Sequence, residues 1–112
     1  MSVKTEIWVQ AFMRRCAAEG LYGAVIAKGA AEAGALFVIV NHLDGTCHLF
    51  GPAPGPAYDD QGERRWIEEV KGPVAESEAL TVFARRRKSD PDCWGIEIED
   101  RKGTAGISAS SQ

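Results

Sequence analysis

Apolar residues recur at helical spacing in two segments of the chain and alternate with polar residues in several others. The helical pattern covers residues 5–19 and 75–88, and a glycine or a proline follows closely after each segment. The strand patterns cover residues 22–28, 63–70 and 94–99 and the two arms of a hairpin within 35–51. The predicted element order is therefore α-β-β-β-β-α-β.

The hairpin contains Asp44-Gly45, a dipeptide that favours a two-residue type I′ turn because both residues tolerate a positive φ. With that turn, His42 lies opposite Cys47 on one face of the hairpin. Both faces are then largely apolar, whereas an antiparallel pair with one solvated side alternates cleanly between apolar and polar residues. The hairpin is therefore predicted to lie centrally in a sheet and to need cover on both faces.

These patterns predict an α+β fold with a single, mostly antiparallel sheet of about five strands and two helices. The predicted strand order is 4-3-2-1-5, and both helix connections fit on one side of such a sheet. One face of the hairpin would then stay exposed in a monomer. Because a large apolar patch on a soluble protein usually marks an interface, this arrangement predicts a homodimer that assembles through the sheet.

Length and composition suit one soluble domain. Of the 112 residues, 45% are hydrophobic and 26% are charged; we predict a single domain over residues 1–102 and a flexible tail over 103–112. The net charge of −3 gives no general attraction for nucleic acid. Three widely separated cysteines, no secretory signal and no apolar stretch that could span a bilayer predict a cytoplasmic protein with reduced thiols and no membrane contact.

Several separated motifs follow one another in an order that is typical of one family. They are IWVQAFMRRC at residues 7–16, NHLDGT at 41–46, GPAP at 51–54, GERRW at 62–66 and DPDCWGIEIEDR at 90–101. Over about residues 5–101 the chain resembles a family of small uncharacterised bacterial proteins known as domain of unknown function 1491. The resemblance implies no activity, cofactor or catalytic residue.

Metal-binding or nucleophilic chemistry would centre on His42 and Cys47, which the predicted register places side by side. Zinc takes four ligands, and the sequence brings only these two together, with Cys16 or Cys93 as conceivable additions. A Cys47 thiolate activated by His42 or His48 is the alternative. Core packing is the simpler interpretation of the pair, and no metal or cofactor is expected.

Acidic residues cluster in two loops. Asp59 and Asp60 follow a proline-rich segment, where they offer oxygen ligands to a hard cation or simply belong to a solvated loop. The loop over residues 51–62 is long enough to be either mobile or a binding loop. Asp90 and Asp92 flank a proline and offer paired carboxylates for acid–base catalysis, or they form the turn that ends the second helix. The turn is the favoured interpretation.

Basic residues offer a recognition surface. Arg85 and Arg86 belong to a run of cations at the end of the second helix, where positive charge also offsets the helix dipole. Arg64 and Arg65 precede Trp66 and would extend this surface if the fourth strand lies near that helix. Guanidinium groups bind carboxylate and phosphate with two parallel hydrogen bonds, so this surface suits an acidic partner.

Three functions are compatible with these residues. The favoured one is a non-enzymatic binding module that holds a protein or a small acidic partner through the four arginines, Trp66, Asp59 and Asp60. The alternative is a small enzyme for an anionic substrate, with a site that joins the 51–62 loop to the Asp90–Asp92 turn. A weaker third function is contact with nucleic acid through the basic helix end.

Overall fold

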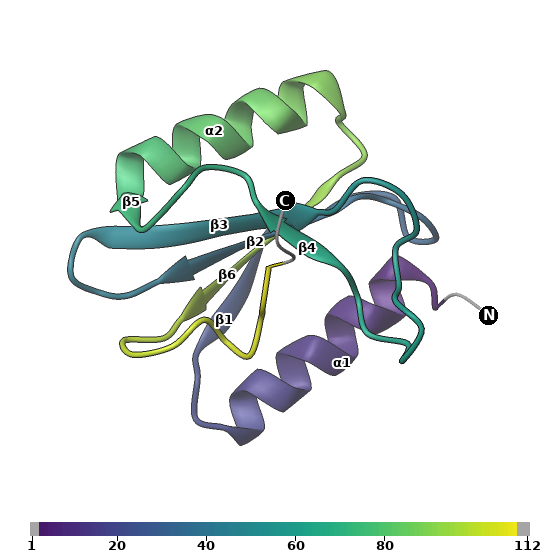
Figure 1. The fold of residues 1–112 in the computed structure, drawn as a ribbon, viewed down its shortest axis with the longest axis horizontal. Helices are drawn as coiled ribbons and strands as arrows, with labels where there is room; N and C mark the ends of the chain where they lie inside the picture. The colour runs from purple at the N-terminus through teal and green to yellow at the C-terminus, as the bar shows by residue number, and fades with distance from the viewer. Residues whose placement is uncertain (1–2, 110–112) are drawn as a thin grey trace.

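The structure, a computed structural model that describes residues 3–109, is an α+β domain with one six-stranded mixed sheet between two helices (Figure 1). The strand order is β1-β6-β2-β3-β4, and β5 pairs with β3 away from this path. Across residues 3–109, no helix is long and apolar enough to cross a membrane. The elements are α1 (Thr5–Ala18), β1 (Gly23–Ala27), β2 (Leu36–Asn41), β3 (Thr46–Pro52), β4 (Trp66–Glu68), β5 (Val74–Ala75), α2 (Glu76–Ser89) and β6 (Trp94–Glu99).

The predicted fold class is confirmed, but the predicted strand order is wrong at the last strand. β6 lies between β1 and β2, antiparallel to the first and parallel to the second. Gly95 permits this central position, because a Cβ atom there would collide with the Phe83 ring of α2. Glu97, which alternates with Ile96 and Ile98, accepts a hydrogen bond from Asn41 Nδ2 at 3.0 Å. The glycine and the glutamate thus alternate with isoleucines because they face α2, not water.

The helices cover opposite faces of the sheet, with α1 below it and α2 above it in Figure 1. All six residues of β2 are buried, since its side chains point alternately toward the two helices. The prediction of an uncovered hairpin face is therefore wrong: each face packs against its own helix. The homodimer prediction loses the observation on which it was based.

The register of the hairpin differs by one residue from the predicted one. Asn41 pairs with Cys47, and the His42 amide donates to the Thr46 carbonyl at 3.0 Å, which leaves a three-residue loop over residues 43–45. Leu43 and Gly45 both adopt a positive φ, 60° and 92°. Because a shift of one residue on one strand moves its side chains to the other face, His42 and Cys47 lie on opposite faces of the sheet.

The fourth strand is shorter than predicted, and the segment before it forms a small loop of its own. Only Trp66–Glu68 pair with β3 as a strand, and the preceding chain folds back through an isolated bridge between Tyr58 and Arg64. The Asp59 carboxylate closes this loop by accepting hydrogen bonds from the amides of Gln61 and Glu63, each at 2.9 Å.

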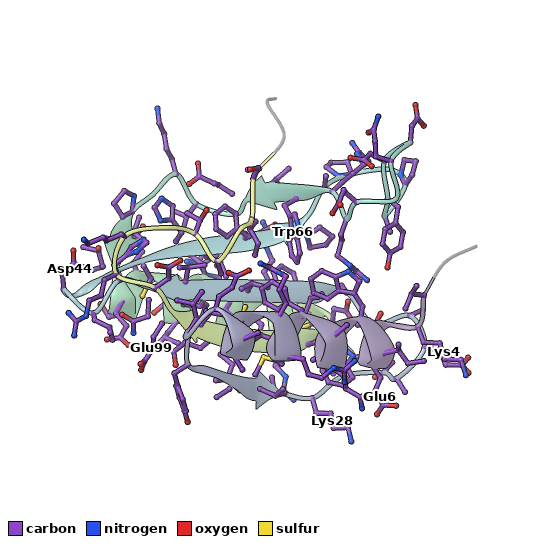
Figure 2. The ribbon with its side chains drawn as sticks, turned by 90° about the horizontal axis from the view of Figure 1, so that it is seen from below. Lys4, Glu6, Lys28, Asp44, Trp66 and Glu99 are labelled. Carbon is purple, nitrogen blue, oxygen red and sulfur yellow. The ribbon has the colours of Figure 1, made fainter. Side chains whose placement is uncertain are left out.

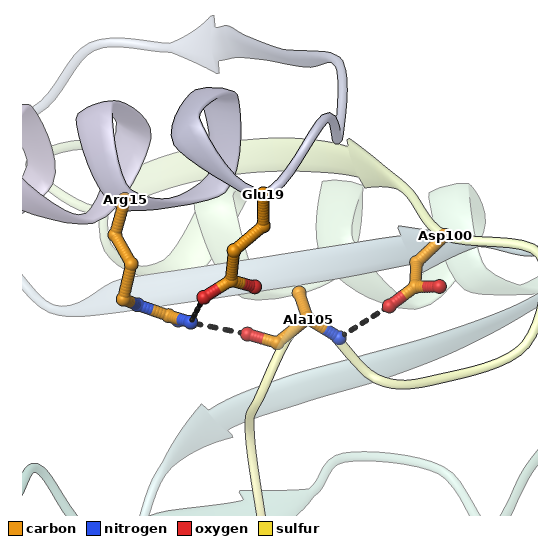
Figure 3. Close-up of polar contacts among 4 residues, drawn as sticks. All are labelled: Arg15, Glu19, Asp100 and Ala105. Atoms are coloured by element: carbon orange, nitrogen blue, oxygen red, sulfur yellow. Dashed lines mark hydrogen bonds and ion pairs between the residues drawn. The ribbon is translucent and has the colours of Figure 1, made fainter.

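The predicted flexible tail is packed as far as the structure describes it. The Asp100 carboxylate accepts a hydrogen bond from the Ala105 amide (Figure 3) and one from the Gly103 amide, each at 3.0 Å, so the chain turns back onto the sheet. Ala105 and Ile107 join the core on the α1 face, and Ala109 forms a bridge with Trp66. The flexibility of residues 103–112 stays a prediction, and residues 110–112 lie outside the described part.

Ile107→Ala tests this packing. Ile107 is 6% exposed, and truncating a buried isoleucine to alanine costs about 2–5 kcal/mol of unfolding free energy, so a loss in this range is expected in urea denaturation. Ser108→Ala, at the exposed neighbouring position, should change the unfolding free energy by less than about 0.5 kcal/mol. Equal stabilities of the two variants would mean that the segment is frayed after all.

Candidate functional site

A cleft of about 800 Å³ lies between α1, the start of β4 and the C-terminal segment. Three parts of the chain that are distant in sequence meet here, because α1 and the C-terminal segment pack on the same face of the sheet. The volume falls within the range of about 300–1,000 Å³ that is typical of small-molecule sites. The lining residues are Trp8, Ala11, Phe12, Arg15, Asp59, Glu63, Arg64, Arg65, Trp66, Gly106, Ile107 and Ser108.

Aromatic rings form the apolar wall of the cleft. Trp8 stacks on Phe12 one helical turn later, with ring centroids 4.9 Å apart and an interplanar angle of 16°. Trp66 of β4 points toward α1 (Figure 2), where its ring centroid lies 5.7 Å from that of Trp8 in a tilted arrangement, and only 5% of Trp66 is exposed. Such pairs are preferred aromatic geometries, so the three rings form a rigid surface.

Arg15 is held in place by two hydrogen bonds, which Figure 3 shows, and by contact with an aromatic ring. Its Nη2 donates to the Ala105 carbonyl at 2.8 Å, and its Nη1 donates to Glu19 at 3.1 Å. Its guanidinium carbon lies 5.1 Å from the centre of the Phe12 ring. Arg15 thus ties the C-terminal segment to α1 and contributes a fixed positive charge to the cleft.

Arg64 lies between two aromatic rings and keeps spare donors. Its guanidinium carbon is 5.0 Å from the Trp8 ring centre and 5.3 Å from that of Tyr58. Nη2 makes one long contact of 3.4 Å with the Tyr58 hydroxyl, and the buried Nε has no hydrogen-bond partner among the described residues. Since buried donors are nearly always paired, this group has unused capacity for an acceptor.

Arg65 determines the shape of the proline-rich loop. Its Nη1 donates to the carbonyls of Pro54 and Pro56, each at 2.8 Å. The loop at the rim of the cleft is therefore tied to β4 through a side chain as well as through the backbone bond from Ala53 to the Arg65 carbonyl.

The structure brings together only some of the residues that the sequence predicted for binding. Asp59, Arg64, Arg65 and Trp66 line the cleft, whereas Asp60 is exposed on the loop outside it. The Asp59 carboxylate is occupied by loop amides, so its role is to shape the rim.

Arg85 and Arg86 do not join the other two arginines in one basic surface, because they belong to the helix on the opposite face of the sheet. Arg86 Nε lies 2.7 Å from Glu69 Oε1, and the Glu69 side chain is only 5% exposed. Arg86 is thus committed to a partly buried ion pair. Arg85 is exposed on α2.

Sequence reasoning missed the half of the cleft that α1 and the C-terminal segment contribute. Trp8, Phe12 and Arg15 look like ordinary positions of an amphipathic helix, and Ile107 is an isolated apolar residue in a polar segment. The one signal that points to them is the spacing of Trp8, Ala11, Phe12 and Arg15, which places all four on one side of a helix.

His42 and Cys47 do not form the predicted pair, since the observed register places them on opposite faces. Burial, with smaller contributions from the Glu76 and Glu97 carboxylates, raises the pKa of the Cys47 thiol to about 11. A buried thiol with a raised pKa is a poor nucleophile. Within residues 3–109, no three His, Cys, Asp or Glu side chains gather closely enough to hold a metal ion.

His42 instead meets His48, which the sequence had placed on the other face. His42 Nε2 lies 2.7 Å from His48 Nδ1, and His42 Nδ1 lies 2.8 Å from the Asp100 carbonyl. A carbonyl only accepts, so His42 Nδ1 carries a proton, and in the neutral pair His48 Nδ1 donates to His42. His48 Nε2 then faces Glu68 at 3.6 Å.

Asp90 and Asp92 form the turn that ends α2. The Asp90 carboxylate accepts from the Asp92 amide at 3.2 Å, and the Asp92 carbonyl accepts from the Ala30 amide at 2.8 Å. Pro91 lines a second cleft of about 430 Å³ beside α2, whereas the 51–62 loop borders the first cleft through Asp59. The two segments of the enzyme hypothesis therefore border different clefts.

Comparisons with known proteins agree with this fold. The family model described as "Protein of unknown function (DUF1491)" matches residues 3–108. The chain belongs to the DUF1491 family. A crystal structure of a DUF1491 protein from Caulobacter crescentus is 36% identical, with a TM-score of 0.80 over 96% of this chain and 97% of that one. The solution structure of protein Atu0922 from A. tumefaciens is 38% identical, with a TM-score of 0.80 over 100% and 99%. No curated protein matches the chain.

The histidine pair of this DUF1491 protein predicts a pH-dependent stability. Burial, and then the neighbouring His42, lower the pKa of His48 below 6.5, while Glu68 opposes the shift. The unfolded chain therefore binds more protons just below pH 6.5, so stability is complete above that pH and falls as the pH drops below it.

Nuclear magnetic resonance of the His48 ring tests this shift directly. A midpoint below 6.5 is expected, and Glu68→Gln should lower it further because the opposing carboxylate charge is lost. Glu63→Gln, in the cleft, serves as the control and should leave the midpoint unchanged. A His48 titration midpoint above pH 6.5, or one that Glu68→Gln leaves unchanged, contradicts the lowered pKa of His48 and its attributed causes.

Proposed function

We propose that this DUF1491 protein is a cytoplasmic, non-enzymatic binding module that holds a small organic anion in the cleft beside α1. The ligand combines a carboxylate or phosphate group with a flat apolar part. The observation that carries the proposal is the Arg64 guanidinium, which lies between two rings at the cleft and whose Nε has no hydrogen-bond partner within residues 3–109. Guanidinium donors in such a position suit an anionic acceptor.

The charges around the cleft favour a ligand with one anionic group. Arg15, Arg64 and Arg65 contribute three positive charges, while Asp59 and Glu63 contribute two negative ones. A polyanion such as nucleic acid would meet these carboxylates, and the exposed Arg85 lies on the other face of the sheet. A single anionic group beside an aromatic wall fits this mixed lining better.

Binding is favoured over catalysis because the candidate catalytic groups lie elsewhere. Asp90 and Asp92 shape the turn after α2, and Cys47 is buried on the α2 face. Asp59 borders the cleft, but its carboxylate holds the loop amides. All three cysteines are free and buried, which suits reduced thiols in the cytoplasm.

Titration with phenyl phosphate tests the proposal, because this probe carries both an anionic group and a ring. Saturable quenching of the tryptophan fluorescence is expected, since Trp8 and Trp66 border the cleft. A hydrogen bond to a charged group contributes about 1.5–3 kcal/mol, so Arg64→Ala should weaken binding by about tenfold or more.

Arg85→Ala is the matched control, since it removes the same side chain from an exposed site outside the cleft. Benzyl alcohol, which keeps the ring without the charge, should bind more weakly than phenyl phosphate. The proposal fails if phenyl phosphate shows no saturable signal, or if Arg64→Ala and Arg85→Ala bind it alike.

A further inference from the structure

The two edge strands of the sheet, β4 and β1, differ in what lies beside them. At the β4 edge, the C-terminal segment forms a bridge between Ala109 and Trp66, and the proline-rich loop lies beside it. At the β1 edge, no segment among residues 3–109 pairs with the outer side of the strand. An edge strand presents unpaired amide and carbonyl groups that can template another strand.

The hydrogen-bond pattern with β6 identifies which groups of β1 point outward. The Glu99 amide donates to the Tyr22 carbonyl at 2.8 Å, and Gly23, Ala24 and Val25 continue the same register against β6. Antiparallel pairs alternate between hydrogen-bonded and non-hydrogen-bonded, so Ala24 bonds to β6. The amides and carbonyls of Gly23 and Val25 therefore face away from the sheet.

The side chains along this edge do nothing to block pairing. Residues 23–27, GAVIA, contain no charge and no proline, the two features that most often protect an edge strand. Tyr22, Val25 and Ile26 are 67%, 44% and 40% exposed. A register shift between Val25 and Ala27 ends the regular part of the strand, so the regular edge is residues 22–25, with the exposed Ile26 directly after it.

We propose that two copies of this protein pair through β1, antiparallel, about a two-fold axis at Ala24. Gly23 of one copy then exchanges two hydrogen bonds with the partner's Val25, and the symmetric pair does the same. This register uses the outward-facing groups of both residues and needs no part of the strand beyond the bulge.

The side-chain sizes match this register. Ala24 meets the partner's Ala24 at a non-hydrogen-bonded position, where the strands approach most closely, at about 4.5 Å between Cα atoms. The exposed Val25 packs beside the partner's Gly23 on the α1 side, where Ile98 and Met13 lie close to the glycine and provide an apolar surface. Tyr22 meets the partner's Ile26, so two exposed apolar side chains cover each other. Pairing brings no like charges together along β1. A second copy of the chain therefore complements this edge.

Charged substitutions of Ala24, which lies on the proposed two-fold axis, test the pairing. Light scattering at high micromolar concentration should give twice the 12.1 kDa of one chain for the wild type. Ala24→Lys should give a monomer, because it places two lysine side chains opposite each other at the two-fold axis. The fold of one chain should tolerate this substitution, because the lysine lies opposite Glu97 of β6, which has the opposite charge. An equal mixture of Ala24→Lys and Ala24→Glu should restore the dimer, since opposite charges then meet at the axis.

Leu80→Lys provides the control, because it adds the same charge at an apolar residue on α2 that is as exposed as Val25, at 44%. It should leave the dimer intact. Hydrogen exchange of the wild type adds a readout that requires no variant: the Val25 amide should exchange more slowly as protein concentration rises. A wild type that stays monomeric, an Ala24→Lys variant that stays dimeric, or a Val25 amide unprotected in the dimer overturns the proposal.

Discussion

The central strand β2, which pairs in parallel with β6, carries buried side chains on both faces, and the rest of the structure depends on this constraint. A parallel pair of this kind is stable only when both faces are covered, so α1 and α2 must lie on opposite sides of the sheet. Asn41 is the one polar residue of β2, and its Nδ2 donates hydrogen bonds to the carboxylates of Glu76 and Glu97. Both faces of the hairpin are therefore apolar because each is covered by one of the two helices of the same chain.

The cleft follows from the way the α1 face is completed. α1 alone leaves the β4 side of that face open, and the C-terminal segment fills part of it with Ala105 and Ile107. The remaining space is bordered by the rings of Trp8 and Phe12 and by arginines that hold the surrounding segments together. Arg15 binds the C-terminal segment and Arg65 binds the proline-rich loop, whereas the Nε of Arg64 has no hydrogen-bond partner in the part of the chain that the structure describes.

Local features of the fold could be predicted from the sequence, and non-local ones could not. Both helices and β6 lie within a residue or so of their predicted ranges because periodicity is a local signal. The place of β6 depends on Gly95 meeting Phe83 of another element, and the register depends on Leu43 adopting a φ of 60° that turn rules do not assign to leucine. For the candidate site, the sequence identifies the residues around Arg64 as a binding surface. The residues of α1 and of the C-terminal segment that complete the cleft meet Arg64 only through tertiary packing, which the sequence does not reveal.

Residue-resolved hydrogen exchange in increasing denaturant tests directly whether β2 and β6 both lie inside the sheet, because it ranks the stability of each strand. If both strands are central, the amides of Val38 in β2 and of Ile96 and Ile98 in β6 exchange only through global unfolding, with one shared free energy of opening. Amides of β6 that open at a clearly lower free energy than those of β2 would place β6 at an edge and contradict the account.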